Sequence, residues 1–177
     1  KTVLTISVIS FLGMIFCSFY LGFTFVLYLS PFALLSLFYF LPVVNLRSIP
    51  GVKAFMVAFV WAVVTVSIPF LLSIKDSFVN QWNYLLTTKQ LFMFSERLCF
   101  VLSLAIIFNV RDIKHDKENG VKTIPVLYGV KVAKVASIIC LLIFSFMVMT
   151  EFKSQVYSNI QVFILLFSAV ITTVFLL

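Results

Sequence analysis

The polar side chains that could carry out chemistry are concentrated in one segment, NVRDIKHDKENGVKTIPVLYG, which runs from Asn109 to Gly129. Asp112 and Asp116 are four residues apart, and Asn109 precedes Asp112 by three. On a helix, where successive residues are about 100° apart, these three side chains fall within an arc of roughly 60°. Carboxylate and amide oxygens are hard ligands that suit Mg²⁺ better than Zn²⁺. The spacing predicts a magnesium site on one helix face, and a solvated loop between two membrane helices is the alternative interpretation.

Three residues further along the segment predict how its backbone runs. Gly120 can end the helix in a left-handed conformation, because glycine adopts positive φ without a steric penalty. Thr123 and Pro125 can then open a second, short helix, because threonine suits the cap position and proline suits the first turn. We therefore expect a helix, a tight turn and a second helix over this segment.

The elements that must position these side chains are long and apolar. The mean hydropathy is +1.18 and only 11% of the residues are charged, so a water-soluble fold of this length could not bury the apolar surface. Runs of about 20 apolar residues, the length that crosses a bilayer, predict about six spans. They are Val3–Leu21, Phe23–Val44, Ala54–Ile74, Gln90–Val110, Val135–Thr150 and Val156–Leu177. The absence of alternating polarity favours helices over a barrel. We expect an all-α, multi-pass transmembrane helix bundle forming a single domain over residues 1–177.

The polar segment resembles the second aspartate-rich motif of the UbiA superfamily of intramembrane prenyltransferases. The family pattern is Asp or Asn, then Arg-Asp, three residues, Asp, and afterwards Gly, Thr and a closing Gly. The matching residues here are Asn109, Arg111, Asp112, Asp116, Gly120, Thr123 and Gly129.

The connection before the third span resembles a second feature of that family, a Tyr…Pro…Lys/Arg stretch leading into a helix that bears a tryptophan. The corresponding residues are Tyr39, Pro42, Arg47 and Trp61, and Lys53 adds a second basic group. Two interpretations of Arg47 and Lys53 stay open. They are either positive anchors at a membrane face or contacts to a diphosphate, since arginine and lysine are common phosphate partners.

The resemblance implies a function. We expect a Mg²⁺-dependent transferase that moves a polyprenyl group from a polyprenyl diphosphate to an aromatic or other lipophilic acceptor, as in isoprenoid quinone biosynthesis. Asp112 and Asp116 would be the catalytic residues, and with Asn109 they would hold the metal. The diphosphate would be bound by a basic and tyrosyl set: Tyr39, Arg47, Lys53, Arg111 and Lys122.

The resemblance also implies a larger fold, because members of the family usually have nine membrane helices and a first motif of the type Asn-Asp-x-x-Asp. That motif is missing from this sequence. We expect the chain to correspond to about the third to the eighth helix, truncated at both ends, and to be inactive on its own, whereas a version extended at the amino terminus is expected to be active. A non-catalytic, degenerate homologue is the other explanation.

Glu96 and Arg97 favour a different alternative, because charged residues inside a span are expensive and often functional. They could line an ion path together with the aspartates of a transporter-like membrane protein. The simpler interpretation is a neutralised pair, or a contact between Glu96 and another helix.

The net charge of +7 does not indicate nucleic-acid binding, because the basic residues fall in the connections between spans. Nine of the thirteen Lys and Arg residues lie on one predicted face: Lys1, Arg47, Lys53, Arg111, Lys114, Lys117, Lys122, Lys131 and Lys134. By the positive-inside rule that face is cytoplasmic, in contact with anionic lipid. We expect an integral protein of the cytoplasmic membrane whose aspartate motif faces the cytoplasm.

This topology can be tested by labelling single cysteines, introduced at Ser48, Asn80 and Lys117 after the native cysteines are replaced. The charge distribution predicts that a membrane-impermeant maleimide labels positions 48 and 117 from one side and position 80 from the other. Labelling of all three positions from one side would contradict the predicted topology.

Overall fold

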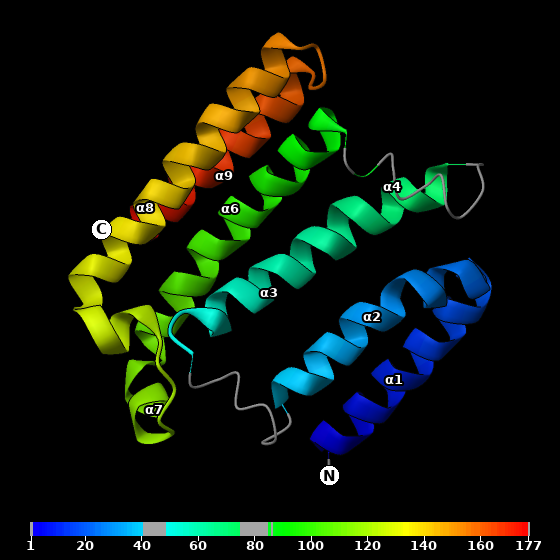
Figure 1. Cartoon of the computed structure of the whole chain (residues 1–177), viewed down its shortest axis with the longest axis horizontal. Coiled ribbons are helices and arrows are strands. Elements are labelled where there is room, and N and C mark those ends of the chain that lie inside the picture. The colour runs from blue at the N-terminus through cyan, green and yellow to red at the C-terminus, as the bar shows by residue number, and fades with distance from the viewer. Residues whose placement is uncertain (1, 41–48, 75–84, 86, 177) are drawn as a thin grey trace.

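A computed structural model of the chain describes residues 2–40, 49–74, 85 and 87–176, and all regular structure in these ranges is helical (Figure 1). The elements are α1 (Thr2–Leu21), α2 (Phe23–Phe40), α3 (Val52–Ala62), the π-helical turn η2 (Val63–Ser67), α4 (Ile68–Ser73), α6 (Thr88–Arg111), α7 (Ile113–Glu118), α8 (Ile124–Lys153) and α9 (Asn159–Leu176). The all-α class is therefore confirmed for the described residues.

Within the described ranges, three helical segments are long and apolar enough to cross a membrane: Val52–Ser73, Thr88–Arg111 and Ile124–Lys153. Shorter apolar stretches occupy Phe25–Leu35 and Asn159–Val174. The protein thus has the helices of a membrane protein, and the count of six spans stays a prediction. The helix that contains the fifth predicted span, Val135–Thr150, extends beyond it in both directions, from the break at Gly129 to Lys153.

The long helices lie side by side in one layer-like bundle (Figure 1). α1 and α2 form a hairpin around Gly22, whose φ is 89° and whose carbonyl accepts a hydrogen bond from the Phe25 N–H at 3.2 Å. The segment α3–η2–α4 packs beside α2 and α6, and α6 packs against both α8 and α9. Consequently the start of α3, the end of α6, α7 and the start of α8 meet at one end of the bundle (Figure 1).

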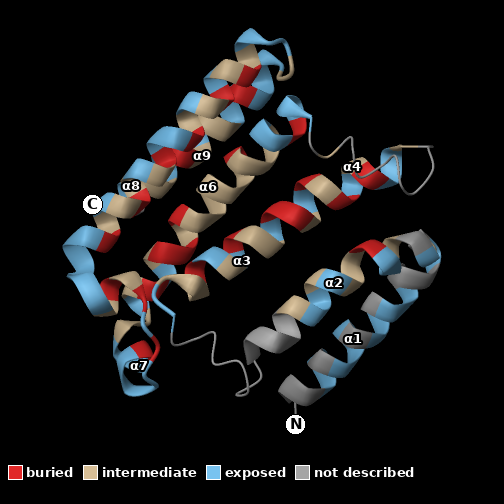
Figure 2. Cartoon of the chain, in the orientation of Figure 1, coloured by how far each residue is buried: buried red, intermediate tan, exposed pale blue. Residues whose placement is uncertain are grey.

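Buried residues line the sides of the helices that face one another (Figure 2), and small and polar side chains are prominent among them. Ala54, Ala58 and Ala62 are at most 1% exposed and repeat every fourth residue along α3. Ser103 of α6 and Ser137 of α8 are fully buried, with 2.7 Å between their hydroxyl oxygens. Close approach through small residues and interhelical hydrogen bonds is how helices associate in a lipid environment.

Many large hydrophobic side chains lie on the outer surface of the bundle. Phe16, Phe23 and Tyr20 are 73%, 80% and 87% exposed. A soluble protein would bury side chains of this size, so the outer surface suits contact with hydrocarbon.

The π-helical turn η2 precedes Pro69, which stands in the first turn of α4. A proline inside a helix cannot donate a backbone hydrogen bond and crowds the carbonyl four residues before it. The wider turn, closed by a bond from the Ile68 N–H to the Val63 carbonyl, lets the chain pass this position without ending the span. The third predicted span, Ala54–Ile74, therefore stays helical past Pro69, as far as Ser73.

The backbone of the polar segment follows the predicted course. Gly120 has φ 68°, the Gly120 N–H bonds the Lys117 carbonyl at 3.3 Å, and the Val121 N–H bonds the Asp116 carbonyl at 2.9 Å. These two bonds are those of a Schellman cap, which satisfies the last carbonyls of α7. A short helix then opens at Ile124 and is interrupted at Gly129, whose φ of 86° and ψ of 166° are not helical.

The break at Gly129 makes a testable prediction about stability. Its φ and ψ lie in a region that only glycine occupies readily, so Gly129→Ala should destabilise the protein by about 1–3 kcal/mol through backbone strain. An added Cβ would meet no atom within 4 Å, so steric contact adds nothing to this cost. The measurement is unfolding in mixed detergent micelles, followed by the helical circular dichroism signal.

Gly13 provides the matched control, because a Cβ there also meets nothing within 4 Å but the residue lies inside α1. Gly13→Ala should stabilise the protein by about 0.5–1 kcal/mol, since alanine is the better helix former. Equal effects at the two positions would contradict the assigned break.

Candidate functional site

The predicted site residues lie at the end of the bundle where α3 begins, α6 ends and α7 crosses below them (Figure 1). Asn109 is in the last turn of α6, Asp112 is at the junction between α6 and α7, and Asp116 is in α7. The junction residue Asp112 has φ −91° and ψ 9°, so α6 ends at Arg111. The expectation of one continuous helical stripe is therefore wrong, because the helix is interrupted between the first and the third of these side chains.

The three side chains on either side of this interruption differ in how far they are buried. Asn109 and Asp116 are buried, at 3% and 2% exposure, whereas the side chain of Asp112 is 38% exposed and accepts a hydrogen bond from the Arg111 Nε at 3.2 Å. Arg111 is itself largely exposed, with its guanidinium carbon 5.3 Å from the centre of the Phe108 ring. The end of the bundle thus combines a buried polar interior with a charged rim.

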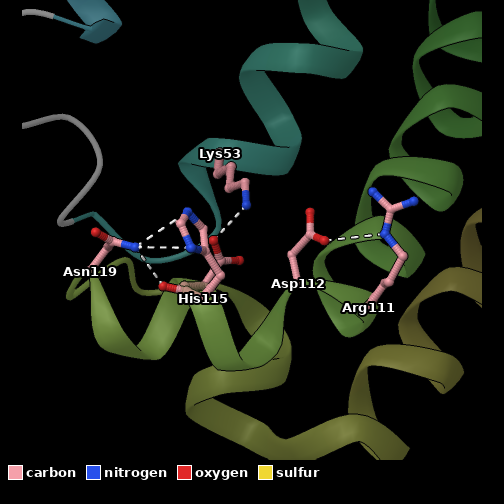
Figure 3. A network of polar contacts seen from close by, with 6 residues as sticks. Lys53, Arg111, Asp112, His115 and Asn119 are labelled. Atoms are coloured by element: carbon pink, nitrogen blue, oxygen red, sulfur yellow. Dashed lines mark hydrogen bonds and ion pairs between the residues drawn. The ribbon is translucent and has the colours of Figure 1, made fainter.

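The interior is organised by an ion pair between α3 and α7. The Lys53 Nζ donates to the Asp116 Oδ1 at 2.6 Å, and Figure 3 shows Lys53 reaching from α3 toward the carboxylate on α7. A buried carboxylate needs such a partner, because an isolated charge in an apolar interior costs several kcal/mol. The Lys53 side chain is 28% exposed, so the ion pair lies at the edge of the buried interior.

A backbone hydrogen bond holds the same two regions together. The Gly51 N–H donates to the Lys122 carbonyl at 3.1 Å, and Gly51, with φ 77°, caps the start of α3. The Lys122 side chain is exposed. This bond brings the connection before α3 against the connection between α7 and α8, so that Lys53 and Lys122 belong to one basic end.

Three buried polar atoms at this end have no hydrogen-bond partner among the described residues: Asn109 Nδ2, Asp116 Oδ2 and Thr123 Oγ1. An unsatisfied buried polar group costs about 1–3 kcal/mol, and native structures contain few of them. Each of these atoms is therefore a candidate for contact with water, an ion or a ligand group.

Of these atoms, Asp116 Oδ2 can accept from a donor or a cation, Asn109 Nδ2 needs an acceptor, and Thr123 Oγ1 can do either. Within the described residues, no three Asp, Glu, His or Cys side chains form a metal-binding group. A Mg²⁺ ion here would therefore have the two carboxylates of Asp112 and Asp116 and the amide oxygen of Asn109, with ligand oxygens completing its shell. The amide of Asn109 would have to present its oxygen, which a half-turn about its last side-chain bond allows.

The predicted diphosphate-binding residues are placed in part. Lys53, Arg111 and Lys122 all lie at this end of the bundle, as described above. Arg47 lies outside the described residues, and Tyr39 is in the last turn of α2, with a side chain that is not described. His115 is exposed, and its carbonyl accepts a hydrogen bond from the Asn119 Nδ2 at 2.8 Å (Figure 3).

A second buried charged cluster lies toward the other end of α6. Glu96 is fully buried, its Oε2 accepts a hydrogen bond from the Tyr157 hydroxyl at 3.0 Å, and its Oε1 is 3.7 Å from an Arg97 nitrogen. The proximity of Arg97 agrees with the interpretation of a neutralised pair, although Glu96 Oε1 has no hydrogen-bond partner among the described residues. The second contact of Glu96 is with the connection between α8 and α9, not with another helix. Sequence reasoning missed Tyr157, because no local pattern connects residues 61 positions apart.

No protein-family model matches this chain, and no curated protein or solved structure is significantly similar to it. The site must therefore be interpreted from its own residues.

The Lys53–Asp116 pair predicts a specific loss of stability. Lys53→Met leaves the buried Asp116 charge without its partner, and we expect a destabilisation of about 2 kcal/mol, because the partial exposure of Lys53 lets water recover some of the loss. Asp116→Asn in the same chain removes that charge, so the double variant should be more stable than Lys53→Met alone.

Arg111→Met is the matched control, since it removes a cation from an exposed ion pair at the same end. Its effect should be under about 0.5 kcal/mol. The free energy of unfolding in mixed micelles is measured for the wild type, Lys53→Met, the double variant and Arg111→Met. An Asp116→Asn substitution that fails to rescue Lys53→Met would contradict the assigned pairing.

Proposed function

We propose that this protein is a membrane prenyltransferase, which transfers a polyprenyl group from a polyprenyl diphosphate to an aromatic or other lipophilic acceptor with the help of Mg²⁺. The proposal combines the resemblance of the Asn109–Gly129 segment to the UbiA superfamily with the physical character of the site. It includes a bundle of about six spans and places the aspartate motif on the cytoplasmic face.

The observation that carries the proposal is the buried Asp116 carboxylate, paired on one oxygen with Lys53 and unpartnered on the other. A carboxylate with a purely structural role would be expected to have both oxygens satisfied. The free Oδ2 is an acceptor, so the missing group is a cation or a hydrogen-bond donor. A divalent cation meets this requirement, and Asp112 and Asn109, at the same end of the bundle, are the other oxygen ligands that the proposal assigns to it.

When bound, Mg²⁺ would supply charge neutralisation to a departing diphosphate. The protein's own residues supply the rest of the diphosphate site. Lys53, Arg111 and Lys122 present positive charge at the same end of the bundle, where arginine and lysine can donate charge-assisted hydrogen bonds to phosphate oxygens. Lys53 neutralises Asp116, and its partly exposed side chain adds to the positive charge at this end.

The interior of the bundle suits the hydrocarbon part of such a substrate. A mostly apolar cavity of about 220 Å³ lies between α2, α3–α4 and the first half of α6. Four aromatic side chains line it, those of Tyr28, Phe32, Phe59 and Phe94. Such an apolar, aromatic lining suits the hydrocarbon tail of the substrate rather than its diphosphate end.

The position of this cavity favours a long prenyl chain. Phe94 and Asn109 are fifteen residues apart on α6, which corresponds to about 22 Å along a helix. A diphosphate held near Asn109 and Asp116 can thus reach the aromatic cavity only through a chain of several isoprene units.

Two other interpretations make different predictions. A transporter-like protein would use Glu96 and the aspartates along one ion path, yet Glu96 lies in the first half of α6 and Asp112 follows its end. A non-catalytic homologue would keep the fold without a working metal site. Neither predicts that Mg²⁺ controls the binding of a prenyl diphosphate.

The direct test measures the binding of geranylgeranyl diphosphate to the purified chain at increasing Mg²⁺ concentration. We expect Mg²⁺-dependent binding by the wild-type chain and a loss of about tenfold to a hundredfold in affinity for Asp112→Asn or Asp116→Asn, because each removes a charged oxygen ligand. Since both residues act through one ion, the double variant should be little weaker than the poorer single variant.

Glu118→Gln is the matched control, because it removes an exposed carboxylate from the same short helix. It should bind as the wild type does. Binding that is independent of Mg²⁺, or equal losses for Glu118→Gln and Asp116→Asn, would refute the proposed function.

A further inference from the structure

The end of the bundle opposite α7 contains a second cavity, which no part of the proposed reaction uses. Its volume is about 390 Å³, and it lies between the start of α6 and the end of α8, which are neighbours at the top of the view in Figure 1. Thr88, Lys89 and Phe92 line it from α6, and Glu151 lines it from α8. The cavity is thus bounded by one cation, one anion, hydroxyl groups and an aromatic ring.

Glu151 is the side chain that identifies this cavity as a binding site. It is 6% exposed, and its Oε2 has no hydrogen-bond partner among the described residues. Burying a carboxylate without a partner is expensive. The unpartnered carboxylate oxygen needs a hydrogen-bond donor, so the expected occupant carries an N–H or O–H group. A positively charged donor is favoured, because it makes the stronger hydrogen bond to a carboxylate.

The charges around Glu151 restrict the occupant further. The neighbouring carboxylate Glu96 is already bonded by Tyr157 and lies beside Arg97. The charged residues in the cavity lining are the buried anion Glu151 of α8 and the exposed cation Lys89 of α6. An occupant that matches both must carry a positive and a negative group with no net charge.

The size and position of the cavity define the class of ligand. A volume of about 390 Å³ is much larger than one water or ion needs, and it lies at the ends of two helices long enough to cross a membrane, where lipid headgroups are found. We propose that this cavity binds a phosphoethanolamine group, with the ammonium on Glu151 and the phosphate facing Lys89 and the Thr88 hydroxyl. Phe92 would contact the apolar part of a lipid that carries this headgroup.

This inference is independent of the proposed prenyltransferase activity, because the two sites lie at opposite ends of α6 and share no residue. The same chemistry occurs in phosphatidylethanolamine and in free phosphoethanolamine. The chain can select phosphatidylethanolamine over phosphatidylcholine, because the quaternary ammonium of choline has no N–H to donate to the Glu151 oxygen.

Native mass spectrometry of the purified 177-residue chain, titrated with either lipid, tests the proposal. The wild type should bind phosphatidylethanolamine about tenfold more tightly than phosphatidylcholine, as expected for one charge-assisted hydrogen bond. Glu151→Gln should lower the affinity for phosphatidylethanolamine to the phosphatidylcholine level and leave the latter unchanged. Lys89→Met should weaken the binding of both lipids several-fold, because both carry the phosphate. The preference for phosphatidylethanolamine over phosphatidylcholine should remain.

Glu118→Gln, at the other end of the bundle, should change neither affinity. Competition with free phosphoethanolamine separates the two sources of the headgroup. If free phosphoethanolamine displaces the lipid at equal concentration, the soluble compound is the ligand. If it does not displace the lipid, phosphatidylethanolamine is the ligand. Equal affinities of the wild type for the two lipids would overturn the proposal without any variant. A preference that survives in Glu151→Gln would overturn it as well.

Discussion

A buried carboxylate inside an apolar helical bundle is the constraint on which the site depends. Asp116 is 2% exposed and reaches its only described partner, Lys53, across 63 positions of sequence. Because an unpaired charge at that position would be costly, the pair fixes the start of α3 against α7. The Schellman cap at Gly120 and the bond from Gly51 to the Lys122 carbonyl then hold the connections around it. The same pair leaves one carboxylate oxygen for a ligand.

Polar groups are placed at the two ends of a scaffold that is otherwise apolar. Between them, α3, α6 and α8 meet through alanines and through the Ser103–Ser137 hydrogen bond. Helices in lipid gain little from the hydrophobic effect between them, so small residues and buried hydroxyl pairs must hold them together. The aspartates and Lys53 then lie toward one end, and Glu151 and Glu96 lie toward the other.

Features that depend on neighbouring residues could be predicted from the sequence. The helical class follows from the apolar runs, and the cap at Gly120 and the short helix after Thr123 follow from local residue preferences. Contacts between distant residues could not be predicted, which is why the Lys53–Asp116 and Glu96–Tyr157 partners were missed. The break at Asp112 was missed because spacing assumes an unbroken helix. The alanines of α3 recur every fourth residue, a pattern in the sequence that predicts a helix face packed closely against another helix.

The most direct test of this account is whether Asp116 binds a metal together with a diphosphate. Electron paramagnetic resonance of Mn²⁺, a substitute for Mg²⁺, would be measured on the chain after gel filtration, with and without inorganic diphosphate. The account predicts Mn²⁺ that is retained by the wild type when diphosphate is present and lost in Asp116→Asn. Retention of equal Mn²⁺ by both proteins, or by neither, would contradict the assignment of Asp116 as a metal ligand.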